Sequence, residues 1–107
     1  MSERKPTPHD AIWDWHRRAI RGERVPIHES TPQAGYYLTR LVARGAYVPG
    51  SIWLEQPTDA ETGELVGDER YRAEILGEEV DANEAWLWLA KRPICKLFYM
   101  EKLGSIF

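Results

Sequence analysis

The stretch between residues 35 and 55 constrains the fold of this chain more than any other. Its sequence, GYYLTRLVARGAYVPGSIWLE, is rich in β-branched and aromatic residues, which favour a pleated, half-buried surface. Residues 43–46 interrupt it, and Gly45 is able to adopt the positive φ that a hairpin loop commonly needs. We therefore expect two antiparallel strands. Because two strands alone are not stable, further elements must cover their apolar side.

A helix is expected before this hairpin. Thr7 is a suitable N-cap, Pro8 fits the first helical position, and apolar residues follow at helical spacing until Gly22. Residues 1–6 are expected to form a mobile tail. Residues 23–34 contain two prolines and show no hydrophobic period, which is typical of a connector.

More strands and helices are expected after the hairpin. Residues 70–76 alternate between polar and apolar side chains, which predicts a third strand, and a turn at Gly77 leads into a short fourth strand. Asp81 begins a capping signature for a helix that continues to about Lys91. A last helix is expected over residues 94–103.

Together these elements predict a single α+β domain over residues 1–107. It would contain an N-terminal helix, a small antiparallel sheet of three to four strands, and two C-terminal helices packed on one face of the sheet. A chain of 107 residues is long enough for one core. It lacks a membrane-spanning apolar stretch and an N-terminal signal region, so we expect a cytoplasmic protein that does not contact membranes.

The net charge of −3 conceals an uneven distribution along the chain. Residues 59–84 contain ten acidic and two basic residues, whereas residues 1–44 and 85–107 each carry a net charge of +3. Five Trp and five Tyr are also many for this length, and such rings are enriched where proteins bind partners. These features indicate a bipolar surface suited to binding, and they concern partner choice rather than the fold.

No residue pattern typical of catalysis or metal binding is present. The pair His28-Glu29 lacks the second histidine of a zinc-protease helix. A single cysteine at an apolar position, Cys95, is typical of inert core, and His16 is more typical of a helix-surface or partly buried residue than of a metal ligand. The clustered carboxylates near Asp81 lie in a polar turn without the burial that general acid catalysis requires. We therefore expect neither an enzyme nor a bound cofactor or metal.

Several short motifs follow one another in an order that resembles a known group of proteins. They are GYY-x-T-R-L-V, VPG-x-IW, D-x-x-TGE, a turn of glycine followed by an acidic residue, and W-x-W followed by RPI. This order resembles that of small uncharacterised proteins in tailed-phage and prophage genomes, over about residues 35–103. That family has no assigned catalytic or binding residues. The resemblance therefore implies only a context, a phage accessory protein acting in the bacterial cytoplasm.

The function expected first is non-enzymatic protein binding that modulates or inhibits a host complex, such as a host-defence or nucleic-acid-processing complex. The chain has more large rings than one small core readily buries, and its acidic segment suits a basic partner surface. The partner would be a host or phage protein, or a second copy in a homo-oligomer. The other interpretation is that the rings are core and the carboxylates a solvated face. The residues expected to form the partner surface are Trp53, Trp86, Trp88, Asp59, Glu61, Glu64, Glu78 and Glu79.

A small nucleic-acid-binding module is the alternative function. Arginines of the N-terminal helix and the hairpin would contact phosphates, and a tyrosine would stack on bases. The chain has no recognised nucleic-acid-binding motif, and its overall acidity opposes this function. The residues expected in this alternative are Arg17, Arg18, Arg21, Arg40, Arg44 and Tyr47.

Overall fold

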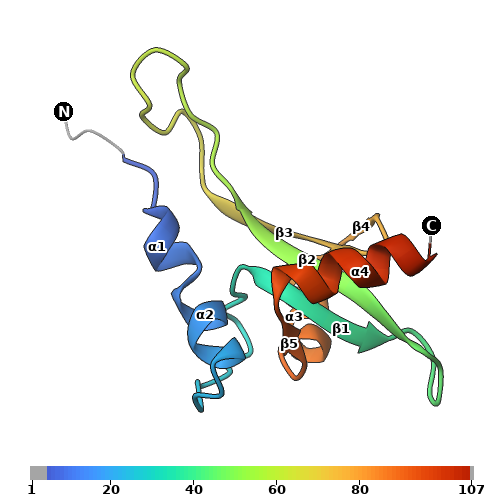
Figure 1. Ribbon diagram of the computed structural model, residues 1–107. Coiled ribbons are helices and arrows are strands. Elements are labelled where there is room, and N and C mark those ends of the chain that lie inside the picture. Colours follow the sequence, from blue (N-terminus) through green and yellow to red (C-terminus); the bar gives the residue numbers. More distant parts are fainter. Residues whose placement is uncertain (1–4, 107) are drawn as a thin grey trace.

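The computed structural model describes residues 5–106, which form a five-stranded antiparallel sheet with helices on both faces (Figure 1). The α+β class expected from the sequence is confirmed. Most of the expected mobile tail, residues 1–6, lies outside the described residues. The elements in chain order are α1 (His9–Ile12), α2 (Asp14–Ile20), β1 (Gly35–Arg40), β2 (Tyr47–Glu55), β3 (Arg70–Ile75), β4 (Glu78–Val80), α3 (Ala82–Leu89), β5 (Pro93–Ile94) and α4 (Lys96–Ile106).

The hairpin expected from residues 35–55 forms the centre of the sheet. All six residues of β1 pair antiparallel with β2. β3 pairs with the other edge of β2, and β4 follows β3 through a two-residue turn at Leu76 and Gly77. Both turn residues have positive φ, 54° and 81°, which matches the twist of the flanking strands.

The sheet has one strand more than the three or four expected. After α3 the chain returns to β1, where Pro93 and Ile94 pair with Tyr37 and Tyr36 as β5. The strand order is therefore β4-β3-β2-β1-β5. The sequence pattern predicts only that Pro93 ends a helix. Proline also suits an edge strand, because it lacks the backbone N–H that a central strand would have to pair.

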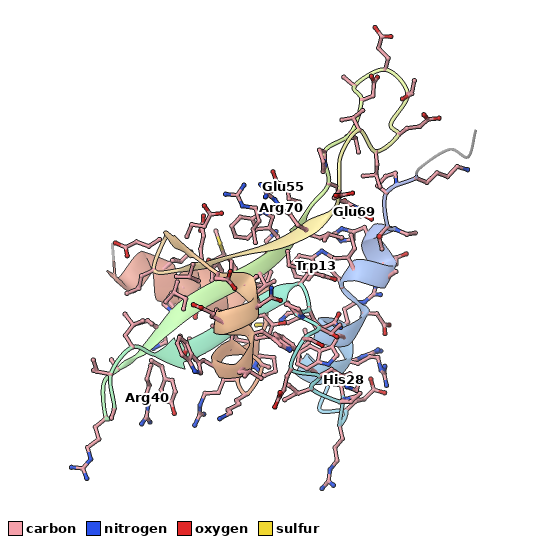
Figure 2. All side chains as sticks on the ribbon, turned by 180° about the vertical axis from the view of Figure 1, so that it is seen from behind. Trp13, His28, Arg40, Glu55, Glu69 and Arg70 are labelled. Atoms are coloured by element: carbon pink, nitrogen blue, oxygen red, sulfur yellow. The ribbon has the colours of Figure 1, made fainter. Side chains whose placement is uncertain are left out.

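The two C-terminal helices lie on opposite faces of the sheet, so the expectation that both pack on one face is wrong. Neighbouring residues of a strand point to opposite faces. Tyr37 packs against Trp86 of α3, with ring centroids 5.9 Å apart, whereas Tyr36 packs against Tyr99 of α4 at 4.7 Å. Figure 1 shows α4 in front of the strands, and the view from behind in Figure 2 shows α3 in front. β5 lies between the two helices in the chain, and the chain changes faces there.

The N-terminal helix is divided in two. Trp13 has φ −95° and ψ 1°, which interrupts the helix between α1 and α2. Thr7 does not cap the first piece, contrary to the prediction. Its backbone N–H and its hydroxyl both donate to the carboxylate of Glu69, which lies 62 residues later in the chain. The entry to α1 is therefore held by the segment that leads into β3 rather than by a local cap.

The core contains a cluster of rings from α2, β1 and α3, which we call the aromatic centre: Trp15, His16, Tyr37 and Trp86. The rings of Trp15 and Trp86 are 5.0 Å apart, and those of His16 and Tyr37 are 5.7 Å apart. Three of its side chains donate hydrogen bonds to the otherwise irregular connector, residues 23–34. They are Trp15 Nε1 to Pro26 O (2.7 Å), Tyr37 Oη to Gln33 O (2.9 Å) and Trp86 Nε1 to His28 O (2.9 Å). The connector is thus ordered by the core, although it contains no helix or strand of its own.

His16 fills the remaining position in the aromatic centre. It is buried, and its Nε2 lies 2.8 Å from the carbonyl oxygen of Ile94 and 3.2 Å from that of Tyr36. Since carbonyl oxygens only accept, Nε2 carries the proton. Burial lowers the pKa of His16, and the two carbonyls offset part of that effect. A Cβ on Gly35 would lie 2.5 Å from His16 Cδ2, so only glycine at this position leaves room for the imidazole.

The molecule is elongated, with principal extents of 53, 31 and 24 Å. The turn between β1 and β2 extends from one end of the sheet, and the loop between β2 and β3 extends from the other (Figure 1). Among residues 5–106, no helix has the length and apolar character needed to cross a membrane.

Candidate partner-binding site

A groove opens where the tip of the β1–β2 hairpin meets the end of α3. We call it the cationic groove and define it by Arg40, Tyr47, Trp88, Lys91 and Arg92. Arg40 and Tyr47 are the last cross-strand pair of β1 and β2, Trp88 lies on α3, and Lys91 and Arg92 lie in the turn between α3 and β5. The groove consists of two adjoining cavities of about 290 and 220 Å³ that share Arg40 and Trp88. Figure 2 shows Arg40 at the hairpin end of the sheet, far from Glu69 and Arg70.

Two arginines are held over one aromatic ring in this groove. The guanidinium carbon of Arg40 lies 4.2 Å from the centroid of the Tyr47 ring, and that of Arg92 lies 4.3 Å from it. Such contacts stabilise by about 0.5–1 kcal/mol each at exposed sites. The ring thus keeps two positive charges close together. Both arginines are exposed, and a guanidinium group is well suited to bidentate binding of a carboxylate.

The positive charges of the groove have no acidic partner among the residues that the structure describes. None of the residues that line the two cavities carries a carboxylate, and Arg40, Lys91 and Arg92 form no ion pair within residues 5–106. The arginines of α2, in contrast, are paired. There Arg17 and Arg18 both lie within 4 Å of Asp14. The groove is therefore a concentrated positive field that an anionic ligand would neutralise.

The three tryptophans predicted to meet a partner have three different environments. Trp88 is 61% exposed at the groove, as the prediction requires. Trp86 is fully buried in the aromatic centre, so its place in the predicted surface is wrong. Trp53 is partly buried on the other face of the sheet, opposite Arg72 of β3. Positions 86 and 88 of α3 differ by about 200° around the helix, which explains why one ring faces the sheet and the other faces solvent.

The predicted acidic residues are not brought together. Asp59, Glu61 and Glu64 lie in the loop between β2 and β3, where Asp59 Oδ1 accepts hydrogen bonds from the backbone N–H groups of Glu61 and Thr62. Glu78 and Glu79 lie on β4, beyond the opposite end of β3. The run of acids in the sequence therefore becomes two separate groups, because a strand of six residues stands between them.

The arginines predicted for the alternative function are also divided. Arg40, Arg44 and Tyr47 lie together at the β1–β2 hairpin, with Arg44 in its turn at φ 64°. The remaining three are on or next to α2 and are paired with acids. These pairs are Arg17 with Asp10 and Asp14, Arg18 with Asp14 and Glu23, and Arg21 with Glu23.

A second cavity, of about 500 Å³, lies at the β3–β4 edge of the sheet. Its charged residues include Arg70, Arg72 and Glu79. Arg72 forms ion pairs with Glu79 and Glu55, and Arg70 pairs with Glu55. The Glu79 carboxylate raises the pKa of Arg72, and the Arg70 side chain is the main cause of a lowered pKa at Glu55. Because these charges already neutralise one another, this cavity attracts an ionic ligand less than the cationic groove does.

The described residues offer few other groups that are typical of metal binding or catalysis. No group of three or more potential metal ligands occurs in the part of the chain that the structure describes. Cys95 is exposed, contrary to the core position expected for it. Lys91 and Arg92 were not among the predicted site residues. In the sequence they are visible only as a basic pair that closely follows Trp88. The pair lies near Arg40 because β5 pairs with β1, and the sequence pattern does not reveal β5.

Searches with this chain found no matching protein-family model, no matching curated protein and no matching solved structure.

Proposed function

We propose that this protein is a non-enzymatic protein-binding module whose cationic groove binds an acidic segment of a partner protein. The observation that carries the proposal is one groove that combines an exposed tryptophan with three basic side chains that form no ion pair within residues 5–106. Tryptophan and arginine are the residues most enriched in binding hot spots. Following the phage resemblance, the partner is a host or phage protein whose complex is modulated or inhibited.

The groove replaces the acidic surface as the basis of the proposal. The acidic residues expected to face a partner are split between two ends of β3, and Glu79 is already paired with Arg72. The basic residues of the groove are close together and free of carboxylates. An acidic partner segment would therefore gain more from the groove than a basic partner would gain from either acidic group.

Nucleic-acid binding is the second candidate, since the same cations could contact phosphates. The geometry of Tyr47 favours it less. Tyr47 was expected to stack on bases, but two guanidinium groups already lie over its ring. Only Trp88 remains as an exposed ring in the groove, whereas single-stranded nucleic acids are bound by successive stacking rings.

The test compares two labelled anionic probes by fluorescence anisotropy at low salt. One is a capped nine-residue peptide of alternating valine and glutamate, and the other is a short oligothymidine. We expect the peptide to bind, the Arg92→Glu variant to bind it at least tenfold more weakly, and Arg24→Glu to bind it within about threefold of wild type. Arg24 is exposed in the connector and provides the matched charge change away from the groove.

Two outcomes would contradict the proposal. If both variants lose affinity equally, the peptide responds to net charge and not to the groove. If oligothymidine binds more tightly than the peptide and depends on Arg92, the nucleic-acid function is correct instead.

A further inference from the structure

β5 covers only the first half of the outer edge of β1. Its two residues pair with Tyr36 and Tyr37, and the last backbone bond between the two segments runs from Leu38 N to Arg92 O at 2.9 Å. The N–H of Arg92 donates to Leu89 O, within the end of α3, rather than to β1. Beyond the N–H of Leu38, the outer edge of β1 therefore has no neighbouring strand among residues 5–106.

The backbone groups at this open edge point outward. Backbone groups of alternate residues in a strand point to the same side, and the N–H of Leu38 points toward β5. The N–H and C=O of Arg40 must point the same way, past the end of β5. On the inner side, Thr39 is paired with Val48 of β2. Arg40 thus presents one donor and one acceptor to any strand that extends the sheet.

The two cavities of the cationic groove lie beside this edge and share Thr39, Arg40 and Trp88. The larger one contains Leu38, Arg40, Tyr47 and Arg92 and is basic. The smaller one also contains Leu41, which is 60% exposed, and the buried Ile75, and it is mainly apolar apart from Thr39 and Arg40. Side chains of a strand added at this edge would alternate between the two faces of the sheet. Arg40 and Tyr47 lie on one face, and α3 with Trp88 covers the other.

We propose that the acidic partner segment binds as an added β-strand along the Leu38–Arg40 edge of β1. Its acidic side chains face Arg40 and Arg92, and its alternate apolar side chains face Trp88. The recognised pattern is thus an alternation of acidic and apolar residues in an extended segment, with backbone hydrogen bonds to Arg40. This inference rests on the proposed function and specifies how the partner is held.

The test uses the valine–glutamate peptide in three forms of identical charge. One is unmodified, one is N-methylated on the valines, and one is N-methylated on the glutamates. Only one alternate set of N–H groups can face β1. We expect one methylated peptide to bind at least tenfold more weakly than the unmodified form and the other to bind within about threefold of it.

A second readout is amide hydrogen exchange of the ¹⁵N-labelled protein, followed by NMR. Exchange of the Arg40 amide should slow when the unmodified peptide is added. The Glu79 amide is the matched control, because β4 pairs through Glu78 and Val80 and the N–H of Glu79 points outward at the opposite edge. Slowing at Glu79 instead of Arg40 would overturn the assignment of the edge.

The remaining outcomes separate the inference from the function on which it rests. If all three peptides bind equally and depend on Arg92, the groove binds acidic segments but strand addition is wrong. If no peptide binds at millimolar concentration, the proposed function fails and the inference fails with it. If the Arg40 amide becomes protected as the protein alone is concentrated, the occupant is a second copy of this chain rather than a foreign segment, and simultaneous protection of Glu79 would identify β4 as the strand that binds.

Discussion

The aromatic centre and the cationic groove use the same kinds of side chain in opposite ways, and α3 contributes a tryptophan to each. In the aromatic centre, the indole N–H of Trp86 donates to a connector carbonyl, and His16 Nε2 lies within hydrogen-bond distance of two carbonyls. In the cationic groove, Trp88 is exposed and the cations Lys91 and Arg92 lack an acidic partner among residues 5–106.

Stability and binding are located in different parts of the molecule. A buried polar group contributes to the fold only when it has a partner, and the aromatic centre meets that condition. In the groove, two like charges lie close together on one ring. This arrangement adds little to the stability of the fold, and an anionic ligand would neutralise it. Substitutions at the two sites should therefore separate stability from binding.

The largest contrast is expected between Trp86→Ala and Trp88→Ala. Trp86 is fully buried, so its truncation should lower the free energy of unfolding by about 3–5 kcal/mol. Trp88→Ala should change it by no more than about 0.5 kcal/mol, since an exposed ring loses little packing. Urea unfolding followed by circular dichroism measures both. A large loss of stability in Trp88→Ala would mean that the ring is covered in solution and that the groove is closed.

A smaller loss is expected from Gly35→Ala in the aromatic centre. The added methyl group would overlap the His16 ring, and overpacking of a tight core typically costs about 1–3 kcal/mol. Gly104→Ala on α4 is the control, because nothing lies within 4 Å of the position of its Cβ. That variant should be as stable as wild type or more stable by up to about 1 kcal/mol, since alanine is the better helix former. If Gly35→Ala is neutral, the imidazole is not held as tightly as the structure indicates.

The pH dependence of stability should report His16. Burial holds the pKa of His16 in the folded protein below the usual histidine value of 6.5, so the unfolded chain takes up the proton first as the pH falls. The free energy of unfolding should therefore decrease from pH 6.5 toward pH 5. The lowered pKa of Glu55 contributes to stability in the same direction, but only at more acidic pH, because its unperturbed value is 4.5.

His16→Gln is the matched variant for this measurement. A glutamine side-chain amide can donate to a carbonyl, as Nε2–H of His16 does, but it does not titrate. Its stability should be nearly constant between pH 6.5 and pH 5, whatever its absolute value. An unchanged slope in this variant would assign the pH dependence to groups outside the aromatic centre.

Local patterns in the sequence predict the elements that depend on neighbouring residues. The β1–β2 hairpin, the β3 alternation and the start of α3 all belong to this class, and Asp81 accepts a hydrogen bond from Glu84 N as its capping pattern predicts. β5 does not belong to this class, because a strand of two residues is too short to show a hydrophobic period. The placement of α4 depends on β5, so the sequence alone could not indicate that α3 and α4 cover different faces.

The site was predicted less well, for the same reason. The prediction from ring content included Trp88, which is exposed, but it could not distinguish Trp88 from the buried Trp86, two residues away on the same helix. Charge counted along the chain suggested one acidic face, which β3 divides in the structure. The groove joins residues 40 and 47 to residues 88–92, and that proximity arises from the pairing of β5 with β1.

The smallest expected effect on stability is that of Lys91→Gln, and it tests whether the groove is free of acidic partners. Lys91→Gln removes one of several like charges, so it should leave the free energy of unfolding unchanged or raise it by up to about 0.5 kcal/mol at low salt. Arg18→Gln on α2 removes the charge that pairs with Asp14 and Glu23, and it should lower the free energy of unfolding by about 0.3–0.5 kcal/mol. Urea unfolding measures the sign of both changes in the free energy of unfolding, because urea carries no charge and does not screen the ion pairs.

Repeating the pair of measurements in 0.5 M NaCl provides the control. Both differences should shrink, since salt screens exposed charges over distances of about 3–10 Å in this concentration range. If Lys91→Gln instead lowers stability as much as Arg18→Gln does, Lys91 has a carboxylate partner in solution. The groove would then resemble the paired surface of α2, and its positive charge would no longer distinguish it as a site for an acidic segment.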